Sequence, residues 1–180
     1  MRTLLQKLEE SLKQKEKELT KFFLFSFIFY TALTFVFFFP YVHIIGSLDT
    51  SMPHRFYLWI RPSEDPEEKD AQIRKRRYVE VYVGDLTQYP PIREKGVLYL
   101  IKKAVCFPGD FLAARGGEFY CNGKLIAVAY PEAPVPPISY DGRIPEGRYF
   151  VLGIHPASFD SRYMGLVSLD RITGVLIPLF

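Results

Sequence analysis

Three separated polar stretches carry the residue types that a covalent hydrolase needs. The first is a turn at residues 49–53, in which Ser51 lies two residues before a proline; the second is the lysine pair at residues 102–103; the third is the segment 158–163. Taken alone, Ser-x-Pro is common turn chemistry. A serine hydroxyl attacks a carbonyl only when a base removes its proton. One of the other two stretches must therefore supply that base.

A lysine suits this role better than the histidine close to the serine. His54 is only three residues from Ser51 and is expected to be an exposed turn residue. A lysine amine becomes a base when burial disfavours its charged form and lowers its pKa from about 10.4 toward neutrality. Lys102 and Lys103 follow an apolar run, and strand alternation sends them to opposite faces. At most one of them faces Ser51, and an exposed strand edge is the alternative reading of the pair.

The N-terminal part of the chain predicts a membrane anchor. Residues 1–21 have the pattern of an amphipathic, cytoplasmic helix. Residues 22–39 hold no charge, and 18 helical residues nearly match a hydrocarbon core of roughly 30 Å. Two isoleucines beyond Pro40 extend the expected transmembrane segment to residues 22–45. The long polar segment ahead of it favours an uncleaved anchor over a cleaved signal peptide.

The distribution of basic residues predicts the orientation of this anchor. Only Arg55 is basic among residues 40–60. Cytoplasmic flanks are enriched in Lys and Arg, so the N-terminus is expected in the cytoplasm and residues 46–180 outside it, with membrane lipid around the anchor. The basic residues before the apolar run are Arg2, Lys7, Lys13, Lys15, Lys17 and Lys21.

The exported part is expected to be mainly β. Short β-prone runs alternate with turn signals, among them Asn122-Gly123, a strong hairpin signal. Residues 63–77 predict either a short exposed helix with Asp65 as its N-cap or a solvated loop. The prolines within 131–147 predict an extended loop. A net charge of +3 is no nucleic-acid footprint, and the scattered histidines and cysteines predict neither a metal site nor a cofactor.

The three polar stretches occur in the order and spacing of the type I signal peptidases, which this chain resembles. The boxes are Ser51-Met52-Pro53, the Lys-Lys-Ala-Val-Cys-Phe-Pro-Gly-Asp of residues 102–110, and the Ser-Phe-Asp-Ser-Arg-Tyr-Met-Gly of residues 158–165. The third box also resembles the TraF-type conjugative-transfer peptidases of that clan. The resemblance implies a signal-peptidase-like β catalytic domain preceded by one transmembrane helix. It further implies a periplasmic domain anchored by a single pass in a bacterial inner membrane.

The resemblance also implies a role for each matching residue. Ser51 matches the nucleophile, and Lys102 matches the general base that takes its proton. Ser158 matches a hydroxyl that orients the lysine amine. Asp160 and Arg162 match an ion pair that braces the site; without the resemblance, an ordinary surface salt bridge would be the first interpretation.

Two positions depart from the family pattern. Asp49 stands where many signal peptidases carry a hydroxyl that donates to the oxyanion, and an ionised carboxylate cannot donate. The oxyanion hole is therefore expected to use the backbone of Ser51 or Thr50. Cys106 replaces a usual glycine and lies 15 residues before Cys121. An oxidising compartment favours a disulfide between them, but the spacing alone leaves the pairing open.

These features predict a membrane-anchored serine endopeptidase that processes an exported pilin precursor for conjugative transfer. Its acyl-enzyme is open to water, giving cleavage, or to a peptide amine, giving cyclisation. The expected partners are the protein substrate, membrane lipid and proteins of the conjugative apparatus, with no nucleic acid. A general signal peptidase for secreted preproteins is one alternative. A non-catalytic assembly subunit that has kept the fold is another, which Asp49 favours.

Overall fold

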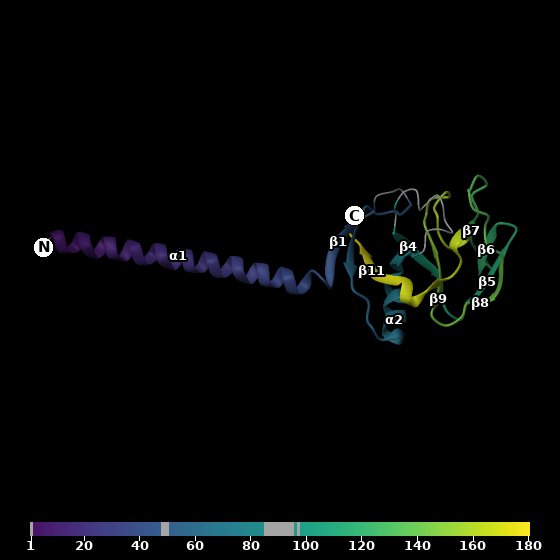
Figure 1. Ribbon diagram of the computed structural model, residues 1–180, viewed down its shortest axis with the longest axis horizontal. Coiled ribbons are helices and arrows are strands. Elements are labelled where there is room, and N and C mark those ends of the chain that lie inside the picture. Colours follow the sequence, from purple (N-terminus) through teal and green to yellow (C-terminus); the bar gives the residue numbers. More distant parts are fainter. Residues whose placement is uncertain (1, 48–50, 85–95, 97) are drawn as a thin grey trace. The chain divides into compact units, whose positions relative to one another are not determined.

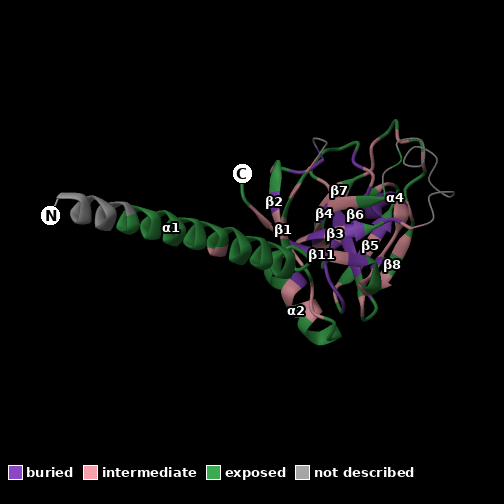
Figure 2. Cartoon of the chain, turned by 60° about the vertical axis from the view of Figure 1, so that its left-hand side comes forward, coloured by how far each residue is buried: buried purple, intermediate pink, exposed green. Residues whose placement is uncertain are grey.

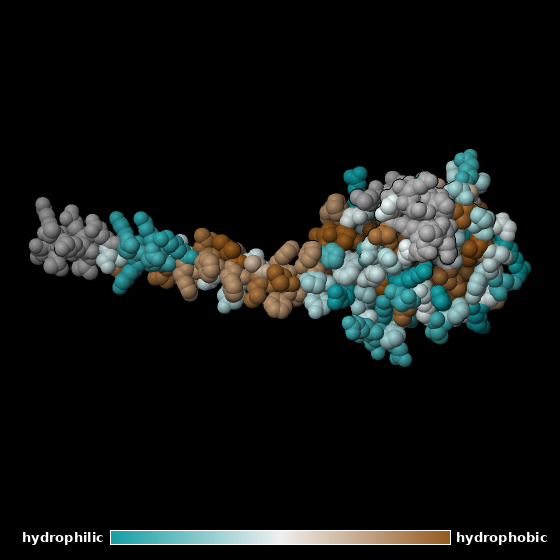
Figure 3. Space-filling view, viewed as in Figure 1, coloured by the Kyte–Doolittle hydropathy of each residue, from teal (hydrophilic) through white to brown (hydrophobic). Residues whose placement is uncertain are grey.

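The computed structural model describes residues 2–47, 51–84, 96 and 98–180, in two compact units, Met1–Tyr41 and Val42–Phe180. The first unit contains one helix, α1 (Arg2–Phe38). Within it, Ser11–Phe38 is long and apolar enough to cross a membrane by length and composition, and Figure 3 shows hydrophobic side chains along its second half. Thr31 and Thr34 donate their hydroxyls to carbonyls four residues earlier, which satisfies both polar groups inside the helix.

The end of α1 corrects the expected span of residues 22–45. The helix ends at Phe38, and residues 42–46 form strand β1, which pairs with β2 (Phe56–Ile60). Pro40 explains the change, because proline lacks the N–H that the next helical turn needs. The isoleucines expected to lengthen the span instead belong to a β-branched strand of the second unit.

The described part of the second unit is built on two antiparallel sheets (Figure 1). The larger has the strand order β1-β2-β11-β3-β4-β9-β10 and the smaller has the order β7-β6-β5-β8. This confirms the predicted mainly β class. The strands are β1 (Val42–Gly46), β2 (Phe56–Ile60), β3 (Tyr78–Tyr82), β4 (Tyr99–Cys106), β5 (Phe111–Arg115), β6 (Glu118–Cys121), β7 (Lys124–Val128), β8 (Tyr140–Arg143), β9 (Arg148–Leu152), β10 (Val167–Ser168) and β11 (Ile172–Pro178).

Helix α2 (Pro66–Arg76) covers part of the larger sheet and has the capping that the sequence predicts. The Asp65 side chain accepts hydrogen bonds from the backbone N–H groups of residues 67 and 68, and Pro66 opens the helix. Ile73 is the buried residue of α2. The Tyr149 hydroxyl of β9 donates to Asp70 at 2.5 Å, and burial together with this carboxylate raises the pKa of Tyr149.

Two β segments differ in detail from the sequence expectations. The proline-rich stretch 131–147, expected as a loop, contains β8, which pairs with β5. The run 167–177 is interrupted by a 3-10 turn, η2 (Leu169–Arg171), between β10 and β11. The Asn122-Gly123 hairpin is confirmed: it joins β6 to β7 with positive φ at both residues.

The two sheets are held together by an apolar core that contains a disulfide. Cys106 ends β4 of the larger sheet, Cys121 ends β6 of the smaller, and the structure joins their sulfurs. Phe150 of β9 packs against Phe119 of β6, with ring centroids 5.4 Å apart. Figure 2 shows the buried residues concentrated on the strands in the middle of this unit, among them β3, β5 and β6. The disulfide therefore ties the strand that carries Lys102 to the second sheet.

Candidate active site

The structure brings together three polar side chains from distant parts of the chain. The Lys102 amine nitrogen lies 3.2 Å from the Ser51 hydroxyl oxygen and 3.0 Å from the Ser158 hydroxyl oxygen. Exposed fractions of 7%, 2% and 5% for Ser51, Lys102 and Ser158 place all three inside the protein. Taking an ammonium out of water disfavours its charged form. Burial therefore acts against the charge of this amine, which lies within hydrogen-bond distance of both hydroxyls.

Strand β4 separates the two neighbouring lysines as the alternation predicts. Lys102 is buried beside the hydroxyls, whereas Lys103 is only partly buried and its amine lies 5.6 Å from the centre of the Tyr78 ring. A lysine amine near the face of an aromatic ring makes a cation–π contact. Of the pair, Lys102 alone contacts Ser51.

The segment that carries Ser158 is fixed by a buried ion pair. Both Asp160 and Arg162 are almost fully buried, and the guanidinium donates to the carboxylate at 2.9 and 2.8 Å. Burial by itself would lower the pKa of Arg162, but the hydrogen bonds and charge of Asp160 raise it above its usual value. Asp160 also caps the short helix α4 (Ser161–Met164) by accepting from the Arg162 N–H.

Arg162 does more than neutralise its partner. Its remaining N–H groups donate to the carbonyls of His155, Pro156 and Ser158, and to Val128 at the end of β7. The guanidinium thus gathers the loop 155–158 around itself and ties it to the smaller sheet. A planar fork of several donors allows this, and a lysine could not reproduce it.

Ser51 is held by the same segment through its backbone. The Ile154 N–H donates to the Ser51 carbonyl at 2.7 Å, and the Gly153 N–H donates to Asp160 at 2.9 Å. A Cβ atom on Gly153 would lie 3.0 Å from the Ser51 carbonyl oxygen and would overlap the Ser158 hydroxyl. Residues 153–162 therefore position both hydroxyls that flank Lys102.

Sequence reasoning missed Gly153, because a glycine after a strand looks like an ordinary turn residue. Its importance comes from a close approach between Ser51 and Ser158, which lie far apart in the sequence. Ser161 was also missed: it is fully buried, and its hydroxyl accepts from the Val151 N–H at 2.9 Å. The sequence signal that could have identified Ser161 is its position directly after Asp160 in the third box.

The predicted oxyanion hole involves residues outside the described part of the chain. Asp49 and Thr50 are not among the described residues, so an oxyanion hole formed by the Ser51 or Thr50 backbone stays a prediction.

Asp110 lies close to Cys106 and Cys121, a grouping with the composition of a metal site. The two sulfurs are bonded to each other, so this grouping offers no thiolates to a cation.

The family profile described as signal peptidase, peptidase S26, matches residues 16–180, and the chain belongs to this family. Probable signal peptidase I-2 of Synechocystis is 36% identical over 76 residues, covering 41% of this chain and 34% of that protein. Signal peptidase I T of Bacillus subtilis is 31% identical over 108 residues, covering 52% of this chain and 56% of that protein. The alignments thus span about a third to just over half of these relatives.

Among solved structures, a signal peptidase I from Enterococcus faecalis is similar at 22% identity with a TM-score of 0.35. The match covers 56% of this chain and 94% of that one.

Proposed function

We propose that this protein is a membrane-anchored serine endopeptidase that cleaves exported protein precursors with a Ser51/Lys102 dyad. The observation that carries the proposal is the buried Lys102 amine, within hydrogen-bond distance of the hydroxyls of Ser51 and Ser158. Membership of the signal peptidase family supports the same reaction. The substrate is therefore a polypeptide, and the scissile bond is a peptide bond.

The reaction begins when neutral Lys102 takes the proton of the Ser51 hydroxyl as its oxygen attacks the substrate carbonyl. Ser158 contacts the same nitrogen and fixes the direction of its lone pair toward Ser51. The carbonyl oxygen becomes an oxyanion, for which the Ser51 N–H is the proposed donor. Collapse of this intermediate expels the amine, which receives the proton from Lys102. Water then hydrolyses the acyl-enzyme and frees Ser51.

The N-terminal helix is the proposed anchor in a bacterial inner membrane. The basic residues before its apolar part, Lys13, Lys15, Lys17 and Lys21 among them, favour a cytoplasmic N-terminus and a periplasmic second unit. Proteinase added to spheroplasts should then digest the second unit. Its survival in spheroplasts, with digestion only after lysis, would place it in the cytoplasm.

A narrower proposal concerns the substrate. The Ser-Phe-Asp-Ser-Arg-Tyr box at residues 158–163 resembles the TraF-type peptidases, which favours a conjugative pilin precursor as substrate and the conjugative apparatus as partner. A peptide amine in place of water would close the shortened pilin into a ring. A general signal peptidase uses the same dyad on many preproteins, so the two functions differ in the substrate accepted and, if the pilin is cyclised, in the group that attacks the acyl-enzyme.

Mass spectrometry of co-expressed precursors tests both proposals. Wild type and the control Lys103→Ala should shorten the precursor, whereas Ser51→Ala and Lys102→Ala should leave it intact. Lys103 is a matched control because it neighbours the base on the opposite face of β4. Equal processing by the wild type and all three variants would overturn the proposed dyad. Processing of a secretory preprotein as readily as a pilin precursor would favour the general peptidase, and a further loss of about 18 Da, one water, would indicate cyclisation.

A further inference from the structure

Three rings pack together directly beside the turn that carries Ser51. The ring centroids of His54 and Tyr57 are 5.9 Å apart, those of His54 and Tyr78 are 6.1 Å apart, and those of Tyr57 and Tyr78 are 5.6 Å apart. His54 meets both tyrosines edge to face, an arrangement that the charge distribution of aromatic rings favours. The proposed peptidase reaction assigns no role to this ring cluster.

The turn is attached to these rings on both sides of its proline. Before Pro53, Met52 is 6% exposed and packs in one apolar cluster with Tyr57 and the partly buried Tyr78. After Pro53, His54 is partly buried against the same two tyrosines. Proline fixes the backbone φ between the two contacts. The position of the nucleophile turn therefore depends on the two tyrosine rings.

Tyr78 connects this turn to the strand of the base. It lies on β3 next to Val79, which stands opposite Lys102 in the pairing of β3 with β4. The Tyr57 ring comes from β2, and β11 lies between β2 and β3, so the contact between the two tyrosine rings crosses an intervening strand. A displacement of the Tyr78 ring would therefore move the Ser51 turn relative to Lys102.

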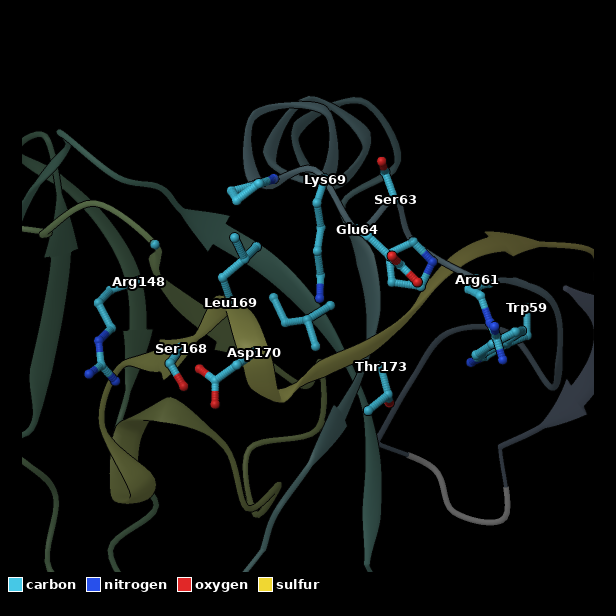
Figure 4. A pocket seen from close by; sticks show the side chains of 14 residues that line it. Trp59, Arg61, Ser63, Glu64, Lys69, Arg148, Ser168, Leu169, Asp170 and Thr173 are labelled. Atoms are coloured by element: carbon cyan, nitrogen blue, oxygen red, sulfur yellow. The ribbon is translucent and has the colours of Figure 1, made fainter. Parts of the chain in front are cut away.

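Trp59 gives the apolar cluster a fixed boundary. Its indole N–H donates to Glu80 at 2.9 Å, and its ring packs closely on Gly174. On this boundary lies a cavity of about 790 Å³, whose lining includes Trp59 together with Lys69 and Asp170 (Figure 4). None of the three rings beside the turn lines this cavity. The ring cluster is therefore packed against a residue that is itself held in place.

We propose that Tyr78 is a positioning residue that holds the Ser51 hydroxyl within reach of the Lys102 amine. His54 is its contact on the turn. The two reacting atoms are 3.2 Å apart, near the upper limit of a hydrogen bond, so a small displacement of the turn would break the contact. Proton transfer needs this contact, which is why the role of Tyr78 rests on the proposed peptidase function. Tyr78 acts on the reaction through the turn.

Steady-state kinetics of the full chain in detergent, on a precursor that the wild type shortens, tests this role. Tyr78→Leu removes the ring and keeps apolar volume, and His54→Ala removes its contact on the turn. Each should lower kcat at least tenfold with KM within about twofold, because misalignment of reacting groups acts on the chemical step. The matched control Tyr82→Leu removes an exposed ring of the same strand, which pairs with Tyr99 at 5.4 Å, and should keep the wild-type kcat.

Conservative variants separate positioning from stability and from acid–base chemistry. Tyr78→Phe and His54→Phe each keep a ring and should restore kcat to within about threefold of wild type, whereas a base at His54 would not be replaced by phenylalanine. All rates are measured where circular dichroism shows the variant folded, and His54→Ala carries the test should Tyr78→Leu fold poorly.

Two results would overturn the positioning role. The first is a kcat in Tyr78→Leu and His54→Ala equal to that of Tyr82→Leu. The second is a His54→Phe variant as slow as His54→Ala. A wild type no more active than Ser51→Ala would instead remove the proposed peptidase function, and the positioning role with it.

Discussion

Two lysines of this protein show how differently one side chain behaves in two surroundings. Lys102 is 2% exposed and lies against the hydroxyls of Ser51 and Ser158, both neutral groups. Lys69 is only partly buried, at the wall of an open cavity that also holds Asp170. Burial acts against the charge of both amines, almost completely at Lys102 and partly at Lys69, where burial lowers the pKa and the charge of Asp170 partly opposes it. Depth of burial and the charge of the neighbours, rather than residue type, therefore separate these two side chains.

The largest expected effect comes from removing each of these lysines in turn. Lys102→Met should lower kcat/KM for peptide cleavage by about 10⁴-fold or more, the scale at which loss of a catalytic base acts. Lys69→Met should leave kcat/KM within about twofold, because surface changes away from the reacting atoms have small effects. Steady-state kinetics on a purified precursor compares the two. Similar losses in both variants would end the distinction between them.

A second prediction concerns the ion pair behind the Lys102 site. Arg162→Met should lower the free energy of unfolding by about 3–5 kcal/mol, because it leaves the buried Asp160 carboxylate without its cation. Denaturant titration measures this change. Arg171→Met removes an exposed arginine and is the control, with an expected change within about 0.5 kcal/mol. Equal stability of the two variants would mean that the pair does not brace the site.

The third prediction concerns the disulfide that ties the Lys102 strand to the smaller sheet. Reduction of Cys106–Cys121 should lower the free energy of unfolding by about 3 kcal/mol, the value expected for a loop of 15 residues. Cleavage should also slow, because Cys106 lies on the strand of Lys102. The double variant Cys106→Ser, Cys121→Ser should reproduce these changes without added reductant.

The smallest expected effect is that of Gly153→Ala, which tests how strongly catalysis depends on the positions of Ser51 and Ser158. Gly153→Ala adds one methyl group between the Ser51 carbonyl and the Ser158 hydroxyl. A small displacement of these groups should cost about 10²-fold in kcat, since catalysis depends on sub-ångström alignment. KM should change little. Gly142→Ala, where a Cβ atom would have open space, is the matched control and should keep wild-type kinetics.

The sequence predicts the Lys102 site better than the Lys69 cavity, for a physical reason. Ser51, Lys102 and Ser158 lie in boxes whose local residue types already indicate their chemistry, and Asp65 with Pro66 marks the start of α2 in the same local way. The cavity instead arises where residues 59–69, 147–148 and 168–173 meet, and no short stretch of sequence encodes that meeting.

The expected end of the membrane span was misplaced for a similar reason, because it depends on contacts between residues far apart in the sequence. Ile44 looked like part of the membrane span because an apolar residue suits a helix in lipid as well as a buried strand, and its pairing with Leu58 of β2 decides the matter. The role of Gly153 likewise depends on two hydroxyl-bearing segments that meet only in the folded chain.

The position of β11 has a consequence for the order in which the protein becomes active. In the larger sheet, β11 (residues 172–178) lies between β2, the strand that follows Ser51, and β3, which pairs with the Lys102 strand β4. Among the described strands, β2 is therefore joined to β3 and β4 only through this late segment. During synthesis, β2 has only β1 as a sheet neighbour among the described strands until those residues are made. Such long-range pairing forms late. A chain that lacks residues 172–178 therefore holds Ser51 without the sheet order that places it beside Lys102.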